Sequence, residues 1–238
     1  MCGANLNDLR GFGKAGKWVI RYGEKLALQT MYGLRLAGTR CPEGVERVLR
    51  ESSADLESVY GLEWYRYRSA RREKRPREFQ KLDDPLVVRF INANDEDERL
   101  TFLERFGLPF APNGAEPRRE VVVRQRTLRR LLAAAGDTDP AIAVTAGNKA
   151  IAAASEQPLH LSLERSGRLP QLVVTAEHLL SFMYMEVAVV AANGARFATC
   201  ANCENAFLTG ALTENRSTAQ YCRDACRVKA YRARQKQR

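Results

Sequence analysis

Residues 175–192 read TAEHLLSFMYMEVAVVAA, and this stretch decides the fold because it predicts a helix that is apolar on nearly every face. Thr175 is a preferred N-cap residue, so we expect the helix to run from Ala176 to Ala192. Asn193-Gly194 then provides a C-terminal stop. A helix that is apolar all round has no solvent-facing side, so we place it at the centre of the core.

The residues before this helix predict a β-hairpin. Leu159 to Leu163 alternates apolar and polar residues, which is the period-two pattern of a half-buried strand. Ser166-Gly167 follows as a turn, and Leu169 to Val174 is expected to form the second strand. An alanine-rich helix is expected upstream, between Pro140 and Ser155. Several helices and a small hairpin in one chain indicate the α+β class.

Further helices are expected closer to the N-terminus. Arg124 to Ala135 carries its leucines on one side, as an amphipathic helix does. Asn94 is a good N-cap for another helix, which should end at Gly107. We also expect a helix near Val45 to Tyr60. The basic stretch Trp64 to Gln80 is interpreted as an exposed helix or a linker.

The composition is that of a folded globular protein of one or two domains. The chain has 238 residues, 45% of them apolar, and a formal net charge of +10. We divide it into a basic, partly helical N-terminal region (1–81), an α+β core domain (82–195) and a C-terminal finger (196–238). The excess of positive charge gives information about binding partners rather than about the fold. The basic residues between Arg118 and Arg130 are interpreted as a solvated helix face.

Several protein classes are not expected. The longest apolar run, Leu179 to Ala192, is shorter than the roughly 20 residues that span a bilayer. The N-terminus lacks the charged start and apolar segment of a secretory signal, so we expect a cytoplasmic protein with reduced thiols. With only two histidines and no evident nucleophile–base pair, we do not expect an enzyme.

Four of the six cysteines form two close pairs near the C-terminus: Cys200 and Cys203, then Cys222 and Cys226. Two intervening residues let a tight turn aim both thiolates at one ion, and three intervening residues place a pair one helical turn apart. Four thiolates satisfy tetrahedral zinc and leave no open position, which predicts one structural zinc ion. The alternatives are coincidental buried cysteines or two disulfides, which a reducing compartment disfavours.

The residues around these pairs predict a small treble-clef-like or knuckle-type zinc finger. Phe207 is expected to pack beneath the metal, with Leu208 joining it. After Cys226 a basic helix should follow, with Val228 and Tyr231 turned toward the finger. Its cations are candidate phosphate contacts, although a solvated, frayed tail is the alternative. The candidate nucleic-acid-binding residues are Arg223, Arg227, Lys229, Arg232, Arg234, Lys236 and Arg238.

Residues 197–238 resemble the C-terminal CGNR-type zinc finger of bacterial transcription regulators. The shared features are the two cysteine pairs, an aromatic residue, an arginine in the turn and a Tyr-Arg-x-Arg tail: Cys200, Cys203, Phe207, Arg216, Tyr221, Cys222, Cys226 and residues 231–234. The Cys-Gly-Asn-Arg step that names the family reads Cys226-Arg227-Val228-Lys229 in this chain. The resemblance implies zinc, DNA as the partner, and an N-terminal domain that senses a ligand or mediates self-association.

These observations lead to two functional hypotheses. The first is a zinc-binding, nucleic-acid-binding protein, a bacterial transcriptional regulator that contacts DNA, or alternatively RNA, through its finger and basic C-terminal helix. The second is a protein-interaction module whose finger is purely structural.

Overall fold

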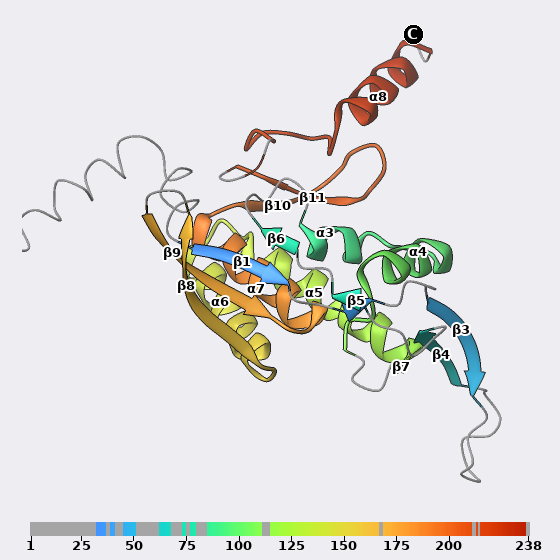
Figure 1. Ribbon diagram of the computed structural model, residues 1–238. Helices are drawn as coiled ribbons and strands as arrows, with labels where there is room; N and C mark the ends of the chain where they lie inside the picture. The colour runs from blue at the N-terminus through green and yellow to red at the C-terminus, as the bar shows by residue number, and fades with distance from the viewer. Residues whose placement is uncertain are drawn as a thin grey trace, which may run out of the picture.

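The computed structural model confirms the α+β class (Figure 1). Within the residues that it describes, six helices are accompanied by eleven short strands. None of these helices is long and apolar enough to cross a membrane. The described residues are 32–36, 39–40, 45–50, 62–67, 73–74, 77–79, 85–110, 115–166, 169–210, 213 and 215–236.

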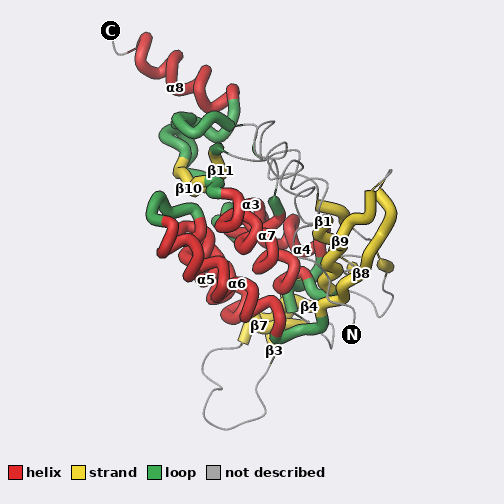
Figure 2. Tube along the Cα trace, turned by 90° about the vertical axis from the view of Figure 1, so that its left-hand side faces the viewer, coloured by secondary structure: helices red, strands yellow, loops and turns green. Residues whose placement is uncertain are grey.

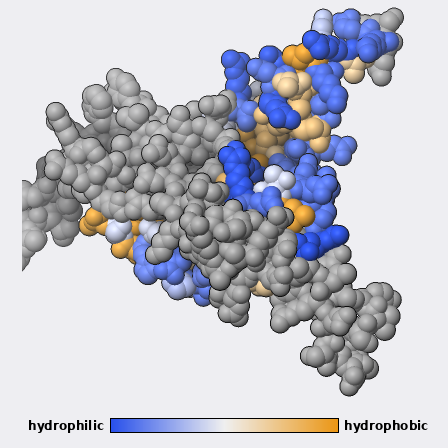
Figure 3. All heavy atoms as spheres, turned by 45° about the vertical axis from the view of Figure 1, so that its right-hand side comes forward, coloured by the Kyte–Doolittle hydropathy of each residue, from blue (hydrophilic) through white to orange (hydrophobic). Residues whose placement is uncertain are grey.

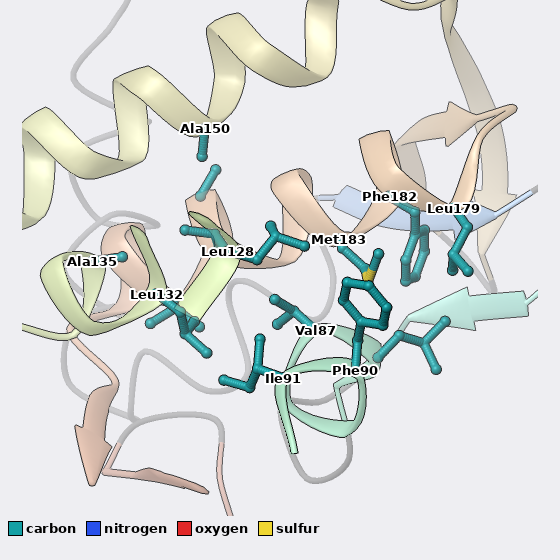
Figure 4. Close-up of a cluster of buried hydrophobic side chains, with 14 of the residues drawn as sticks. Val87, Phe90, Ile91, Leu128, Leu132, Ala135, Ala150, Leu179, Phe182 and Met183 are labelled. Atoms are coloured by element: carbon teal, nitrogen blue, oxygen red, sulfur yellow. The ribbon is translucent and has the colours of Figure 1, made fainter. Parts of the chain in front are cut away.

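Five helices form the body of the molecule: α3 (Leu86–Ile91), α4 (Glu96–Phe106), α5 (Arg118–Ala135), α6 (Pro140–Ser155) and α7 (Leu179–Asn193). Helix α7 lies at their centre, as predicted, and packs against α3, α5 and α6. Its Phe182, Met183 and Val187 side chains are fully buried. Figure 4 shows apolar side chains of these four helices converging on one core.

A buried carboxylate connects two of the core helices. Glu186 of α7 is only 1% exposed. Its carboxylate oxygens accept hydrogen bonds from the backbone N–H groups of Leu86 and Val87, at 2.9 and 2.7 Å. The first N–H groups of a helix have no partner inside that helix, and the positive end of the helix dipole attracts an anion. The one acid in the apolar run therefore caps the start of α3.

A four-stranded sheet covers another side of α7 (Figure 1). The predicted hairpin is confirmed as β8 (Leu159–Ser166) and β9 (Leu169–Ala176), which pair antiparallel. Strand β1 (Tyr32–Leu36) pairs parallel with β9, and β6 (Arg77–Phe79) completes the order β6-β1-β9-β8.

The N-terminal region contains strands where helices were expected. The helix prediction for Val45 to Tyr60 is wrong over 45–50, which form β3 (Val45–Arg50), and 51–60 lie outside the described residues. The helix-or-linker interpretation of 64–80 is also wrong for its described residues, while 68–72, 75–76 and 80 lie outside them. That segment contributes to β4 (Leu62–Tyr67) and forms β5 (Glu73–Lys74) and β6.

The physical reason is pairing between distant segments. Strand β4 is rich in the aromatic residues that favour strands, and it pairs antiparallel with both β3 and β7 (Ala115–Pro117). Strand β2 (Thr39–Arg40) pairs with β5. The rest of the basic N-terminal region, including residues 1–31, lies outside the described residues.

Two helix starts differ from the predicted ones. The N-cap of α4 is Asp95 rather than Asn94, and its carboxylate accepts a hydrogen bond from the Glu98 N–H at 2.8 Å. Helix α7 begins at Leu179 after His178, not at Ala176. Thr175 does not cap this helix, because its backbone continues β9 and pairs with β8.

The other predicted helix ends are close to those observed. Helix α6 has the predicted bounds. Helix α5 begins at Arg118, six residues before the predicted Arg124, directly after Pro117. The stops at Gly107 and Gly194 are confirmed, and both glycines have positive φ angles, 93° and 61°. Glycine adopts this backbone region without steric cost, which suits it to a helix C-terminus.

Candidate metal centre

The four paired cysteines come together in a C-terminal module. Strands β10 (Arg196–Thr199) and β11 (Ala206–Thr209) form an antiparallel hairpin, and the turn between them carries Cys200 and Cys203. Cys222 precedes α8 (Asp224–Lys236), and Cys226 lies in its first turn. Figures 1 and 2 show this module between the helical body and the protruding α8.

The sulfur geometry fits tetrahedral zinc. All four cysteines are free thiols, and their sulfur atoms lie within 4.8 Å of one another. The Cys203–Cys222 and Cys222–Cys226 sulfur separations are both 3.6 Å. Four sulfurs at about 2.3 Å from a central zinc ion stand about 3.8 Å apart in a regular tetrahedron. The cluster therefore has the ligand type, number and spacing for one zinc ion, and the two-disulfide alternative is wrong.

Backbone hydrogen bonds hold the first cysteine pair in a tight knuckle. The Cys200 N–H donates to the Asn205 carbonyl at 2.9 Å, and the Glu204 N–H donates to the Cys200 carbonyl at 3.0 Å. Glu204 adopts a left-handed backbone with φ of 60°, which is uncommon for a residue with a side chain. The Ala201 N–H reaches the Gln220 carbonyl at 3.0 Å and so connects the knuckle to the second pair.

The environment favours the thiolate form of two of the four cysteines, Cys200 and Cys226, whereas burial raises the pKa of Cys203 and Cys222. Burial raises the pKa of Cys200, but hydrogen bonds from the backbone N–H groups of Cys222, Asn202 and Cys203 outweigh it and lower the pKa to about 6. Burial likewise opposes ionisation of Cys226, whose pKa is nevertheless lowered, chiefly by hydrogen bonds from neighbouring thiols. Metals bind the thiolate form, so backbone donors that stabilise the anion favour coordination.

One of the predicted nucleic-acid contacts lies beside the sulfurs. A hydrogen bond between the Arg223 guanidinium and Cys226, together with the charge of that thiolate, raises the pKa of Arg223. A cation next to a cluster of thiolates offsets their negative charge, so Arg223 also supports the metal centre.

An aromatic residue packs against the cysteine cluster. Phe207 is buried and packs with Cys200 and Cys226, as predicted. The expectation that Leu208 joins it is wrong, because Leu208 is buried in the main core. Consecutive side chains of a strand point to opposite faces, so β11 sends Phe207 to the metal centre and Leu208 to the helical body.

The module is attached to the body by an amide clamp. The Asn92 side chain, at the end of α3, donates to the Ala206 carbonyl and accepts from the Ala206 N–H, both at 2.8 Å. Phe197 of β10 packs against the main core. A methyl group added at Gly136 would lie 2.4 Å from the Phe197 nitrogen, so the end of α5 and β10 are in close contact.

The predicted basic helix is confirmed as α8, but its apolar residues are not turned inward. Val228 and Tyr231 are 42% and 57% exposed, and Cys226 is the only described residue of α8 that is buried. The helix leaves the module after its first turn (Figures 1 and 2), and both side chains stay exposed.

The candidate nucleic-acid-binding cations gather on and beside this helix. In α8 they are accompanied by one acid, Asp224, which forms an exposed ion pair with Arg227 at 3.1 Å. Figure 3 shows hydrophilic side chains over most of the described surface of this part of the molecule. Arg238 lies outside the described residues. The cations within them are Arg223, Arg227, Lys229, Arg232, Arg234 and Lys236.

The structure also reveals functional candidates that the sequence interpretation passed over. Arg126 and Arg129, assigned above to a solvated helix face, line a polar groove that reaches Cys203. Their spacing of three residues on α5 was a visible signal, but nothing in the sequence indicated that this face meets the metal centre.

Comparisons with known proteins add no relative. No protein-family model matches this chain, and no curated protein matches it.

Proposed function

We propose that this chain is a zinc-dependent nucleic-acid-binding protein that uses α8 as its main contact element. The observation that carries the proposal is a cationic helix that projects from the body and begins inside the four-cysteine cluster. Zinc would fix the first turn of this helix and so set its direction. Because zinc contributes folding energy to such small modules, loss of the metal should remove the binding surface.

The dimensions of α8 suit duplex DNA. Thirteen residues make a helix about 20 Å long and, with side chains, about 10–12 Å wide. The major groove of B-DNA is about 12 Å wide and admits a helix, whereas that of double-stranded RNA is too deep and narrow to be read by side chains. We therefore favour duplex DNA over duplex RNA.

The resemblance to CGNR-type zinc fingers supports the same function. On that basis we propose that the chain is a cytoplasmic bacterial transcriptional regulator. We propose a binding role rather than a catalytic one, because four cysteine ligands already complete a tetrahedral zinc site.

The proposal is tested by titrating the full-length, zinc-loaded protein into a labelled DNA duplex across a salt series. A variant with Arg227, Lys229 and Arg232 changed to glutamine should bind more weakly. Its slope of log affinity against log salt should fall by about 0.9 for each lost phosphate contact. The control changes Arg119, Arg130 and Lys149, three exposed cations of the body, and should bind as the unmodified protein does. Equal affinities for both variants would contradict the assignment to α8.

A protein-interaction module is the second candidate, and one observation favours it. Val228 and Tyr231 expose apolar surface on α8, which suits a protein partner better than phosphate. In that case the glutamine variant would bind DNA no differently from the control. Changing Val228 and Tyr231 to serine would instead abolish partner capture while leaving zinc content unchanged.

A further inference from the structure

A polar groove lies where the metal centre meets the helical body. It has a volume of about 560 Å³ and reaches from Arg126 and Arg129 of α5 to Cys203 and Glu204 of the knuckle. Three arginines line it, the third being Arg99, against the single acid Glu204. Such a concave, positively charged surface is suited to an anion.

Part of this polar lining has a structural task. The Gln125 amide donates to the Phe90 and Ala93 carbonyls, and Arg129 donates to the Ile91 carbonyl at 2.9 Å. These bonds go to carbonyl groups at the end of α3 and just after it, of which that of Phe90 also accepts from the Ala93 N–H at 3.2 Å. Arg129 is therefore held in place at the groove wall and uses one of its five N–H donors to stay there.

One arginine of the groove is not used in this way. Arg126 is exposed, stands three residues before Arg129 on α5, and forms no ion pair with any residue in the described part of the chain. Arg99 is 9% exposed, and its guanidinium already donates to two backbone carbonyls and forms an ion pair with Glu96 at 3.2 Å. The groove thus combines two arginines that are held by the protein with one, Arg126, that is not.

We propose that this groove holds a backbone phosphate of the nucleic acid that α8 binds. The inference rests on the proposed function and extends it to a second contact surface. The groove reaches Cys203 and α8 carries Cys226, and all four sulfurs of that cluster lie within 4.8 Å of one another. The groove and the first turn of α8 are therefore adjacent at the metal centre. Arg126 is the phosphate contact, because arginine presents paired donors that match phosphate oxygens.

The competing explanation is that these arginines only balance the charge of the cluster. Four thiolates around a divalent zinc ion carry a net charge of −2, and nearby arginines stabilise it. The two explanations differ in what removal of Arg126 does. A phosphate contact changes nucleic-acid affinity and its salt dependence, whereas charge balance changes zinc retention.

The test replaces Arg126 with glutamine and titrates the zinc-loaded, full-length protein into a DNA duplex across a salt series. The matched control is Arg130→Gln, which removes an exposed arginine one turn later on the same helix, beside a different hollow between α5 and α6. We expect the R126Q slope of log affinity against log salt to fall by about 0.9, with a loss of affinity that shrinks as salt rises. The R130Q slope should stay unchanged.

The remaining outcomes would overturn either the groove assignment or the proposed function. An R126Q slope equal to that of R130Q would overturn the groove assignment. So would a loss of zinc from R126Q under mild chelation, with normal binding once zinc is restored. If R126Q binds normally but the α8 glutamine variant does not, only the groove assignment fails. If the unmodified protein binds no duplex at low salt, the proposed function itself fails.

Discussion

Replacing Asn92 with alanine removes the two hydrogen bonds that attach the zinc module to the helical body. The Asn92 amide exchanges both bonds with the backbone of Ala206, which is only 2% exposed. Without the amide, one buried N–H and one buried C=O lose their partner. Each unsatisfied group costs about 1–3 kcal/mol, so Asn92→Ala should lower the free energy of unfolding by about 2–6 kcal/mol.

The assay is urea unfolding of the zinc-saturated protein, followed by circular dichroism. Asn92→Ala should lower the urea concentration at the midpoint of unfolding. It should not change the slope of the unfolding free energy against urea concentration, because unfolding exposes the same surface area in both proteins. Asn92→Asp should also destabilise the protein, because its carboxylate still accepts from the Ala206 N–H but sets a second acceptor oxygen against the Ala206 carbonyl. The control is Asn148→Ala on the exposed side of α6, which should stay within about 0.5 kcal/mol of the unmodified protein. An Asn92→Ala loss no larger than that of the control would refute the clamp.

Four further changes probe the metal centre and the core. Cys203→Ser should bring zinc below one ion per chain by mass spectrometry and reduce the helical signal of α8. Retained zinc would contradict its ligand role. Glu204→Gly should raise the free energy of unfolding by about 1 kcal/mol, because glycine adopts φ of 60° without strain, and a decrease would count against that reading. Gly136→Ala should lower the free energy of unfolding by about 1–3 kcal/mol by overpacking against β10, measured by thermal unfolding, and an unchanged stability would contradict the close contact. Glu186→Ala should lower the free energy of unfolding, measured in urea, by about 2–6 kcal/mol, because two buried N–H groups of α3 lose their acceptor. A loss below about 1 kcal/mol would contradict the capping role.

The features that the sequence predicted correctly depend on local patterns. Helix α7 could be placed at the centre because residues 179–192 are apolar on nearly all sides. The ends at Gly107 and Gly194 follow from the backbone freedom of glycine. The four cysteines could be assigned to one ion because their spacings suit a knuckle and a helical turn, and the sulfur positions agree.

The features that could not be predicted depend on partners far away in the chain. The pattern of residues 45–50 is too short to separate helix from strand, and the choice is made by pairing with β4. Thr175 has the propensity of a cap but is taken up by β9. Asn92 and Ala206 are separated by 114 residues, and no spacing rule relates them. The groove between α5 and Cys203 could not be predicted either, because its residues are also far apart in the chain.

The most direct test of the central claim is a DNA-duplex titration of the full-length protein before and after removal of zinc. We predict that the zinc-loaded protein binds at low salt, that chelation abolishes binding, and that one equivalent of zinc restores it. Duplex binding that survives complete removal of zinc, or an absence of binding by the zinc-loaded protein, would contradict the account.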